Sequence, residues 1–113
     1  MSSRRVITEF GTGNDLHGGD YTKAAVRAVQ DAIHHSSLTL IRSLGVDAKT
    51  MQVEVTIGVQ QPDRVELAAV KSALPHGQVT VKAVKGGLDV PDDDGRDTAI
   101  IATAAVTVRV DLD

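Results

Sequence analysis

Apolar positions along the chain switch between a spacing of two residues and helical spacing, and this alternation predicts an α+β fold. The clearest strand is 51–59, where Met51, Val53, Val55, Ile57 and Val59 alternate with mostly polar residues. In chain order, the pattern predicts a strand over 4–10, a helix over 21–44, a strand over 51–59, a helix over 62–74, and strands over 78–85 and 98–112. The glycines at 45 and 77 are typical helix ends.

This order, β-α-β-α-β-β, predicts one domain over 1–113, built as a four-stranded mixed sheet with both helices on one face. The last two strands are expected to form a hairpin across the loop 86–97. The other face of the sheet is polar with some aliphatic residues, and a second subunit could cover it. By strand parity that face carries Ile7, Glu9, Glu54, Thr56, Thr80, Lys82, Val84, Ile101, Thr103, Thr107 and Arg109.

Composition adds a reason for self-association and excludes several classes of function. Only 2% of the 113 residues are aromatic, so the core consists of small aliphatic side chains that bury little area each. The net charge is −3 with no basic stripe, which argues against nucleic-acid binding. Without cysteine the chain has neither disulfides nor thiolate chemistry, and without an apolar span of about 20 residues we expect a cytoplasmic protein.

Candidate chemistry gathers in 10–20, FGTGNDLHGGD, directly before the first predicted helix. Gly11, Gly13 and Gly18 would let the backbone adopt positive φ and approach a ligand closely. The start of the following helix would direct free amide groups toward an anion or a carbonyl oxygen. The stretch lacks the third glycine of a dinucleotide fingerprint and the GK[ST] of a phosphate-binding loop.

Asp15 and His17 are the candidate catalytic residues of this loop, and the residues leave several roles open. Both could contact one ligand, or Asp15 could orient His17 for proton transfer. They could also supply two ligands to a divalent metal, although no third ligand is evident in the chain. In the alternative without a site, Asp15 bonds backbone amides of a tight turn and His17 is simply exposed.

Other chemistry-bearing residues carry weaker signals. Strand parity places Lys82, Glu54 and Arg109 on the polar sheet face as further ligand-binding candidates. The pair Gly86 and Gly87 is either a turn or bulge or a wall of the same pocket. His34 and His35 are expected at the surface or at an interface, and His76 at a helix end. The acidic run Asp92 to Asp94 is expected to be a solvated loop.

Gly11, Gly13, Asp15, His17 and Gly18 fit G-x-G-x-D-x-H-G, and this motif resembles the signature of an uncharacterised conserved family of bacteria and plants. The stretches TKAAVRAVQDAI, KGGLDVP and IIATAAVTV are similar to the same family, so the resemblance covers nearly the whole chain.

The element order also resembles the Bacillus-type chorismate mutase fold that the YjgF family shares. That resemblance implies homotrimers with ligand sites between subunits, and in it Arg109 would correspond to a carboxylate-binding arginine. The ring-opening amidohydrolases look like a more distant relative, but the chain does not show their Ser and Lys motifs clearly.

We therefore expect a small-molecule-binding protein, a homotrimer or higher homo-oligomer, that holds a polar or anionic metabolite in a cleft between subunits without a cofactor. Its reaction, if it has one, would be hydrolysis of a cyclic amide or imine-type bond. The alternatives are a non-catalytic regulatory module, or a metal-dependent enzyme that uses Asp15 and His17 with a ligand from a neighbouring chain.

Overall fold

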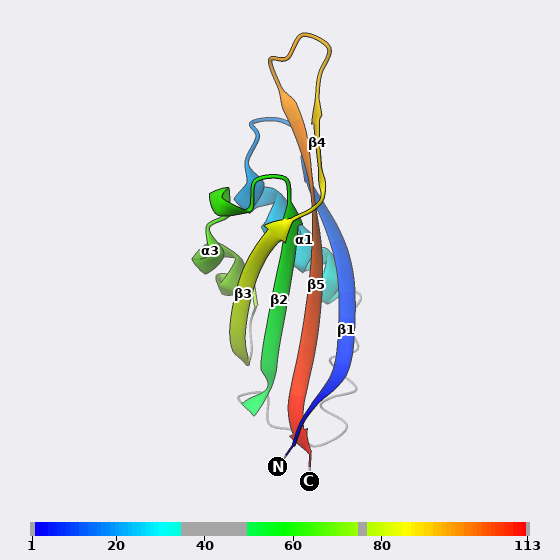
Figure 1. Cartoon of the computed structure of the whole chain (residues 1–113), viewed down its shortest axis with the longest axis vertical. Coiled ribbons are helices and arrows are strands. Elements are labelled where there is room, and N and C mark those ends of the chain that lie inside the picture. The colour runs from blue at the N-terminus through cyan, green and yellow to red at the C-terminus, as the bar shows by residue number, and fades with distance from the viewer. Residues whose placement is uncertain (1, 35–49, 75–76, 113) are drawn as a thin grey trace.

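The computed structural model describes residues 2–34, 50–74 and 77–112, which form an elongated two-layer α+β unit (Figure 1). Its elements are β1 (Ser2–Asp15), α1 (Tyr21–His34), β2 (Gln52–Val59), the 3-10 turn η2 (Pro62–Arg64), α3 (Leu67–Ser72), β3 (Gln78–Lys85), β4 (Leu88–Pro91) and β5 (Thr98–Leu112). The part of the predicted first helix beyond His34 lies outside the described residues, as do His35 and His76.

The sheet has five strands, so the prediction of a four-stranded β-α-β-α-β-β sheet is wrong. The strand order is β1-β5-β2-β3, and β4 pairs with β5 beyond the end of β2. β2 and β3 are parallel, whereas β5 runs antiparallel to β1, β2 and β4. The hairpin across the acidic loop therefore joins β4 to β5, and β3 is not its partner.

One short strand, β4, lies within 86–97, the segment that the sequence predicts as a loop. β4 is only four residues long and has two aliphatic side chains, Leu88 and Val90, too few for the alternation to predict a strand. Gly86 and Gly87 carry the chain from the end of β3 across the end of β2 to reach β5. Gly87 has φ +62°, and a Cβ there would lie 2.1 Å from the Ile101 carbonyl oxygen. The glycine pair is thus a close backbone crossing, which Gln60 stabilises by donating to both glycine carbonyls at 3.1 Å.

Both described helices pack on the same face of the sheet (Figure 1). On β2 the expected alternation is confirmed, because Val53, Val55, Ile57 and Val59 are buried against the helices while Gln52 and Glu54 are exposed. On β5 every second side chain is buried in the same layer, at Ile100, Ala102, Ala104, Val106, Val108 and Val110. Burial of this aliphatic layer supplies the hydrophobic stabilisation of the fold.

No described helix packs on the opposite face, which we call the open face. Register places on it Arg5, Thr8, Phe10, Thr12, Asn14, Gln52, Glu54, Thr56, Gln78, Thr80, Lys82, Val84, Leu88, Val90, Ala99, Ile101, Thr103, Ala105, Thr107 and Arg109. Ile7 and Glu9, expected there, instead pair with Val108 and Val106 of the helix-covered layer. The register shift between Arg5 and Ile7 explains this difference, because an extra residue in a strand reverses the facing of the residues on one side of it.

The second predicted helix is also divided. Val65 has extended φ and ψ of −85° and 127°, and it separates η2 from α3. Glu66 is the N-cap of α3, and its backbone N–H bonds to Thr22 Oγ1 at 2.9 Å.

Candidate functional site

Gly11 and Gly13 lie inside β1, so the expectation that a glycine loop ends this strand after Phe10 is wrong. An added Cβ on Gly11 would come within 2.3 Å of the Ala28 carbonyl oxygen. A Cβ on Gly13 would lie 2.3 Å from both the Ala24 carbonyl oxygen and the Ala28 nitrogen. These two glycines let the alanine side of α1 approach β1 at backbone distance. Their position is explained by packing, and a direct role in ligand binding stays a prediction.

Asp15 ends β1 and is 3% exposed. Its Oδ2 accepts the backbone N–H of Asp20 at 2.8 Å, and its Oδ1 lies 3.9 Å from the Arg27 guanidinium. Asp20 in turn accepts the N–H of Lys23 at 3.0 Å and caps α1. The Asp15 carboxylate therefore fixes the turn 16–20 against the start of α1. This matches the alternative without a site, in which Asp15 bonds the backbone amides of a tight turn.

His17 pairs with a different carboxylate, 80 residues along the chain. Its Nδ1 lies 2.8 Å from Asp97 Oδ2, and the Gly18 N–H donates to Asp97 Oδ1 at 3.2 Å. The hydrogen bond from the imidazole, and then that from the Gly18 amide, lower the pKa of Asp97. The His17 side chain is 86% exposed. Gly18 adopts φ +94°, the left-handed backbone that turns its amide toward Asp97.

A pocket of about 230 Å³ lies where the turn 16–20 meets the β4–β5 hairpin. It is lined by Leu16, His17, Val90, Pro91, Asp92, Asp97 and Ala99. The apolar side chains form most of its walls, and His17 and the two aspartates are its polar groups. This is the usual composition of a small-molecule site, apolar with a few convergent polar side chains.

A second carboxylate ties the hairpin to α1 on the helix-covered side. The Tyr21 hydroxyl donates a hydrogen bond to Asp89 of β4, and the Arg64 guanidinium lies 5.0 Å from the centre of the Tyr21 ring. Burial, followed by the hydrogen bond to Asp89, raises the pKa of Tyr21. Asp89 Oδ1 is buried with no hydrogen-bond partner among the described residues. The base of the hairpin is thus held by Tyr21 on one face and by His17 on the other.

The structure does not bring the other candidates to this pocket. Arg109 and Glu54 form an ion pair at 2.9 Å on the open face. Arg109 follows Asp97 by twelve residues along the chain, which corresponds to roughly 40 Å of extended strand. Lys82 is exposed on β3, beside Thr56 in the register. Neither it nor the crossing glycines 86 and 87 line the pocket.

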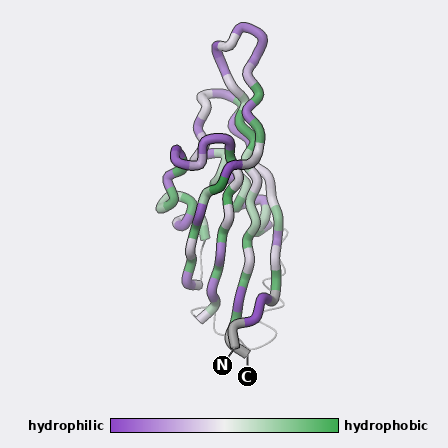
Figure 2. Tube along the Cα trace, viewed as in Figure 1, coloured by the Kyte–Doolittle hydropathy of each residue, from purple (hydrophilic) through white to green (hydrophobic). Residues whose placement is uncertain are grey.

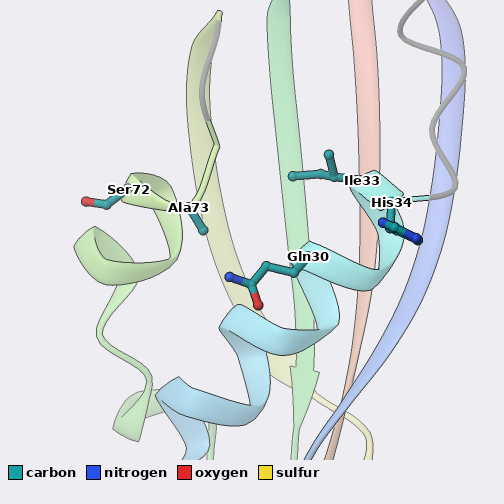
Figure 3. A pocket seen from close by; sticks show the side chains of 5 residues that line it. All are labelled: Gln30, Ile33, His34, Ser72 and Ala73. Atoms are coloured by element: carbon teal, nitrogen blue, oxygen red, sulfur yellow. The ribbon is translucent and has the colours of Figure 1, made fainter.

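A groove of about 320 Å³ lies between α1 and α3 and is lined by Gln30, Ile33, His34, Ser72 and Ala73 (Figure 3). Its polar groups do not converge, since Ser72 points away from Gln30 in Figure 3 and its hydroxyl donates to the Ala68 carbonyl at 2.9 Å. We therefore place the candidate site at the hairpin.

Asp97 and Tyr21 are the residues that sequence reasoning missed. Asp97 stands at the end of an acidic run that is typical of a solvated loop, and nothing local separates it from Asp92, Asp93 and Asp94. The signal that could have found it is non-local. Antiparallel pairing of β1 with β5 places Asp15 opposite Ile100, and so brings His17 beside the start of β5.

Among the residues described here, no group of three or more histidine, aspartate and glutamate side chains is arranged to hold a metal ion. No helix of the described ranges is both long and apolar enough to cross a membrane, and a cytoplasmic location stays a prediction.

Comparisons with protein families and with solved structures each find a match. The model of a family described as "Conserved hypothetical protein (Lin0512_fam)" matches residues 5–108. The crystal structure of an FtsZ-like protein of unknown function from Nostoc punctiforme is similar over 99% of each chain, with 36% sequence identity and a TM-score of 0.88. A search among curated proteins finds no match. The expectation of an uncharacterised conserved family is confirmed, whereas neither the eight-residue motif nor a chorismate mutase-like fold is confirmed.

Proposed function

We propose that this chain, which belongs to the Lin0512 family of conserved hypothetical proteins, binds a small polar molecule in the pocket between the turn 16–20 and the β4–β5 hairpin. The observation that carries the proposal is the pairing of His17 with Asp97 at the wall of that pocket. Two segments that are far apart in the sequence meet there. The turn contributes His17, the hairpin contributes Asp92 and Asp97, and each segment forms part of the apolar wall.

The carboxylate fixes how the imidazole can meet a ligand. Because Asp97 accepts from Nδ1, the neutral ring carries its proton on Nδ1 and its lone pair on Nε2. An exposed Nε2 can accept a hydrogen bond or a proton from a bound molecule. Asp97 therefore takes the orienting role that the sequence suggested for Asp15.

The charges of the pocket favour a neutral or cationic ligand over an anion. Asp92 and Asp97 both line it, and the pKa of Asp97 is lowered, so this carboxylate is ionised at neutral pH. The backbone amides expected to attract an anion already donate within the protein. The Lys23 N–H bonds to the Asp20 carboxylate, and the Asp20 N–H bonds to the Asp15 carboxylate. We propose amide-, amine- or hydroxyl-bearing metabolites as the ligand class.

Proton transfer is the second candidate function, and the His17–Asp97 pair favours it. An imidazole oriented by a carboxylate is a common general base, and such a group contributes about 10²–10⁴ in rate. His17 could remove a proton from water during hydrolysis of a cyclic amide or imine-type bond. The proposal uses no metal, because the Asp15 carboxylate faces Asp20 and Arg27 rather than His17.

A thermal-shift screen with neutral and cationic metabolites tests the binding function. A compound present at one hundred times its Kd should stabilise the wild type by about 2.7 kcal/mol. The His17→Ala and Asp97→Ala variants should lose most of this shift. Asp93→Ala changes an acidic residue that does not line the pocket and should keep it. Compounds that stabilise all four proteins equally would contradict the proposed site. The second candidate function predicts a different result: if His17 is a general base, His17→Ala should lose turnover while substrate binding is largely kept.

A further inference from the structure

Four of the six large exposed apolar side chains among the described residues lie on the open face. Phe10 is 71% exposed, Leu88 57%, Val90 49% and Val84 42%. Register places these four side chains on one face, since Phe10 pairs with Ala105, Leu88 with Ile101 and Val90 with Ala99, while Val84 is level with Gly58. Contiguous apolar patches on a protein surface mark interaction sites.

We propose that a second copy of this chain covers the open face, with the two copies antiparallel about a two-fold axis near Thr103. This inference goes beyond the proposed function, and assembly can be measured without a ligand. Val90 and Ala99 of the open face also line the pocket, so the interface would border the proposed ligand site. A two-fold interface uses the same patch on both copies, and the patch must therefore be complementary to itself.

The charges along the open face meet that requirement. Arg109 follows Thr103 by six residues and Asp97 precedes it by six, so each lies roughly 20 Å from the centre of the patch in opposite directions. The end near Arg109 also carries Arg5, which pairs directly opposite it in the sheet. The other end is the hairpin tip, which is acidic overall: Asp92, Asp93 and Asp94 stand at its turn with one cation, Arg96, that pairs with Asp94 at 3.4 Å. Figure 2 shows this tip as hydrophilic.

An antiparallel arrangement brings the arginine end of each copy against the acidic tip of the other, and the apolar side chains meet in the middle. Two arginines directly opposite each other destabilise an isolated sheet pair. Within the described residues Glu54 bonds one of them, Arg109, at 2.9 Å. Acidic residues from a second copy would add further compensation.

The face is also large enough. The molecule measures 57 × 23 × 19 Å, and its longest extent runs along the strands (Figure 1). A face of 57 × 23 Å has an area of about 1,300 Å². A standard stable interface buries about 800 Å² on each partner. The alignment of two twisted sheets within about 30° is a common packing geometry.

Sedimentation equilibrium on the full chain tests the proposal, with two matched pairs of variants. Val84 and Leu67 are both 42% exposed, but Val84 lies on the open face and Leu67 on α3. We expect the wild type to have twice the chain mass of 11.9 kDa at micromolar concentration. Val84→Glu should raise the dimer dissociation constant by about a hundredfold or more, because it buries an unpaired charge. Leu67→Glu should leave it unchanged.

The second pair tests the charge arrangement. Arg5 lies on the open face opposite Arg109, whereas its neighbour Arg4 pairs with the buried Val110 on the other face. Arg5→Glu should weaken the dimer several-fold at low salt, and Arg4→Glu should not. A wild type of single-chain mass would overturn the proposal, as would a dimer that Val84→Glu leaves intact. A three-chain mass, as the resemblance to trimeric proteins implied, would overturn the two-fold arrangement.

Discussion

Replacing Gly13 with alanine tests how closely α1 approaches β1, and with it the reason why the glycines stand in this strand. The new Cβ would lie 2.3 Å from two backbone atoms of α1, the Ala24 oxygen and the Ala28 nitrogen. Backbone atoms of a helix cannot turn aside as a flexible side chain can. Contact distances between carbon atoms are near 3.5–4.0 Å, so the helix must move by about 1 Å or more.

The expected loss of stability follows from two opposing effects. Overpacking of this kind costs about 1–3 kcal/mol, and the collision with two backbone atoms places Gly13→Ala at the upper end. Removing a glycine stabilises by about 0.4–1 kcal/mol because the unfolded chain loses freedom. The net prediction is a loss of about 2 kcal/mol, which corresponds to a fall of about 10 °C in Tm for a domain of this size.

Urea denaturation at one protein concentration provides the assay, since assembly would make the midpoint concentration-dependent. The control is Gly58→Ala, another strand glycine, whose added Cβ would meet the Thr103 hydroxyl at 2.6 Å. Thr103 is exposed and its side chain can rotate, so this variant should stay within about 1 kcal/mol of wild type. If Gly13→Ala proved as stable as Gly58→Ala, the backbone-distance packing of α1 on β1 would be refuted.

Two further predictions concern the carboxylate pairs that hold the hairpin. Tyr21→Phe removes the hydroxyl that donates to Asp89 and should destabilise the protein by about 1–3 kcal/mol in urea denaturation. Because the pKa of Tyr21 is raised in the folded protein, wild-type stability should fall as pH rises above 10.0, and the Tyr21→Phe variant should lack this loss. Because the pKa of Asp97 is lowered, its stabilisation is full above its ordinary pKa of 3.8 and is lost as pH falls through the folded value. Urea midpoints of wild type and Asp97→Ala should therefore converge in acid, and a constant difference at every pH would contradict the role of the pair.

The sequence was informative wherever one face of an element is buried and the other is not. β2 and β5 show this best, because the helices cover one face of each and the alternation of Val53, Val55 and Ile57 follows directly. The prediction was wrong at two glycines, because glycine is common both in flexible loops and where two backbones pack closely. Gly11 and Gly13 read as a flexible loop, but the need for close contact with α1 keeps them in β1.

Part of the site was predictable and part was not. The sequence singled out His17 and Gly18 because glycine and histidine in a short segment indicate a turn with chemistry, and their role in a site stays a prediction. Their partner Asp97 depends on the pairing of β1 with β5, a contact between opposite ends of the chain that no local pattern reveals. The short strand β4 was missed for a similar reason, since its four residues form a strand only through pairing with β5.

NMR mapping of a bound ligand tests the proposed site most directly, with the stabilising compound from the thermal-shift screen added to isotope-labelled protein. We predict that the largest chemical-shift changes fall on Leu16, His17, Val90 and Asp97, and that they disappear in the His17→Ala variant. Changes concentrated instead on Gln30, Ile33 and Ser72, in the groove between α1 and α3, would contradict the proposed site.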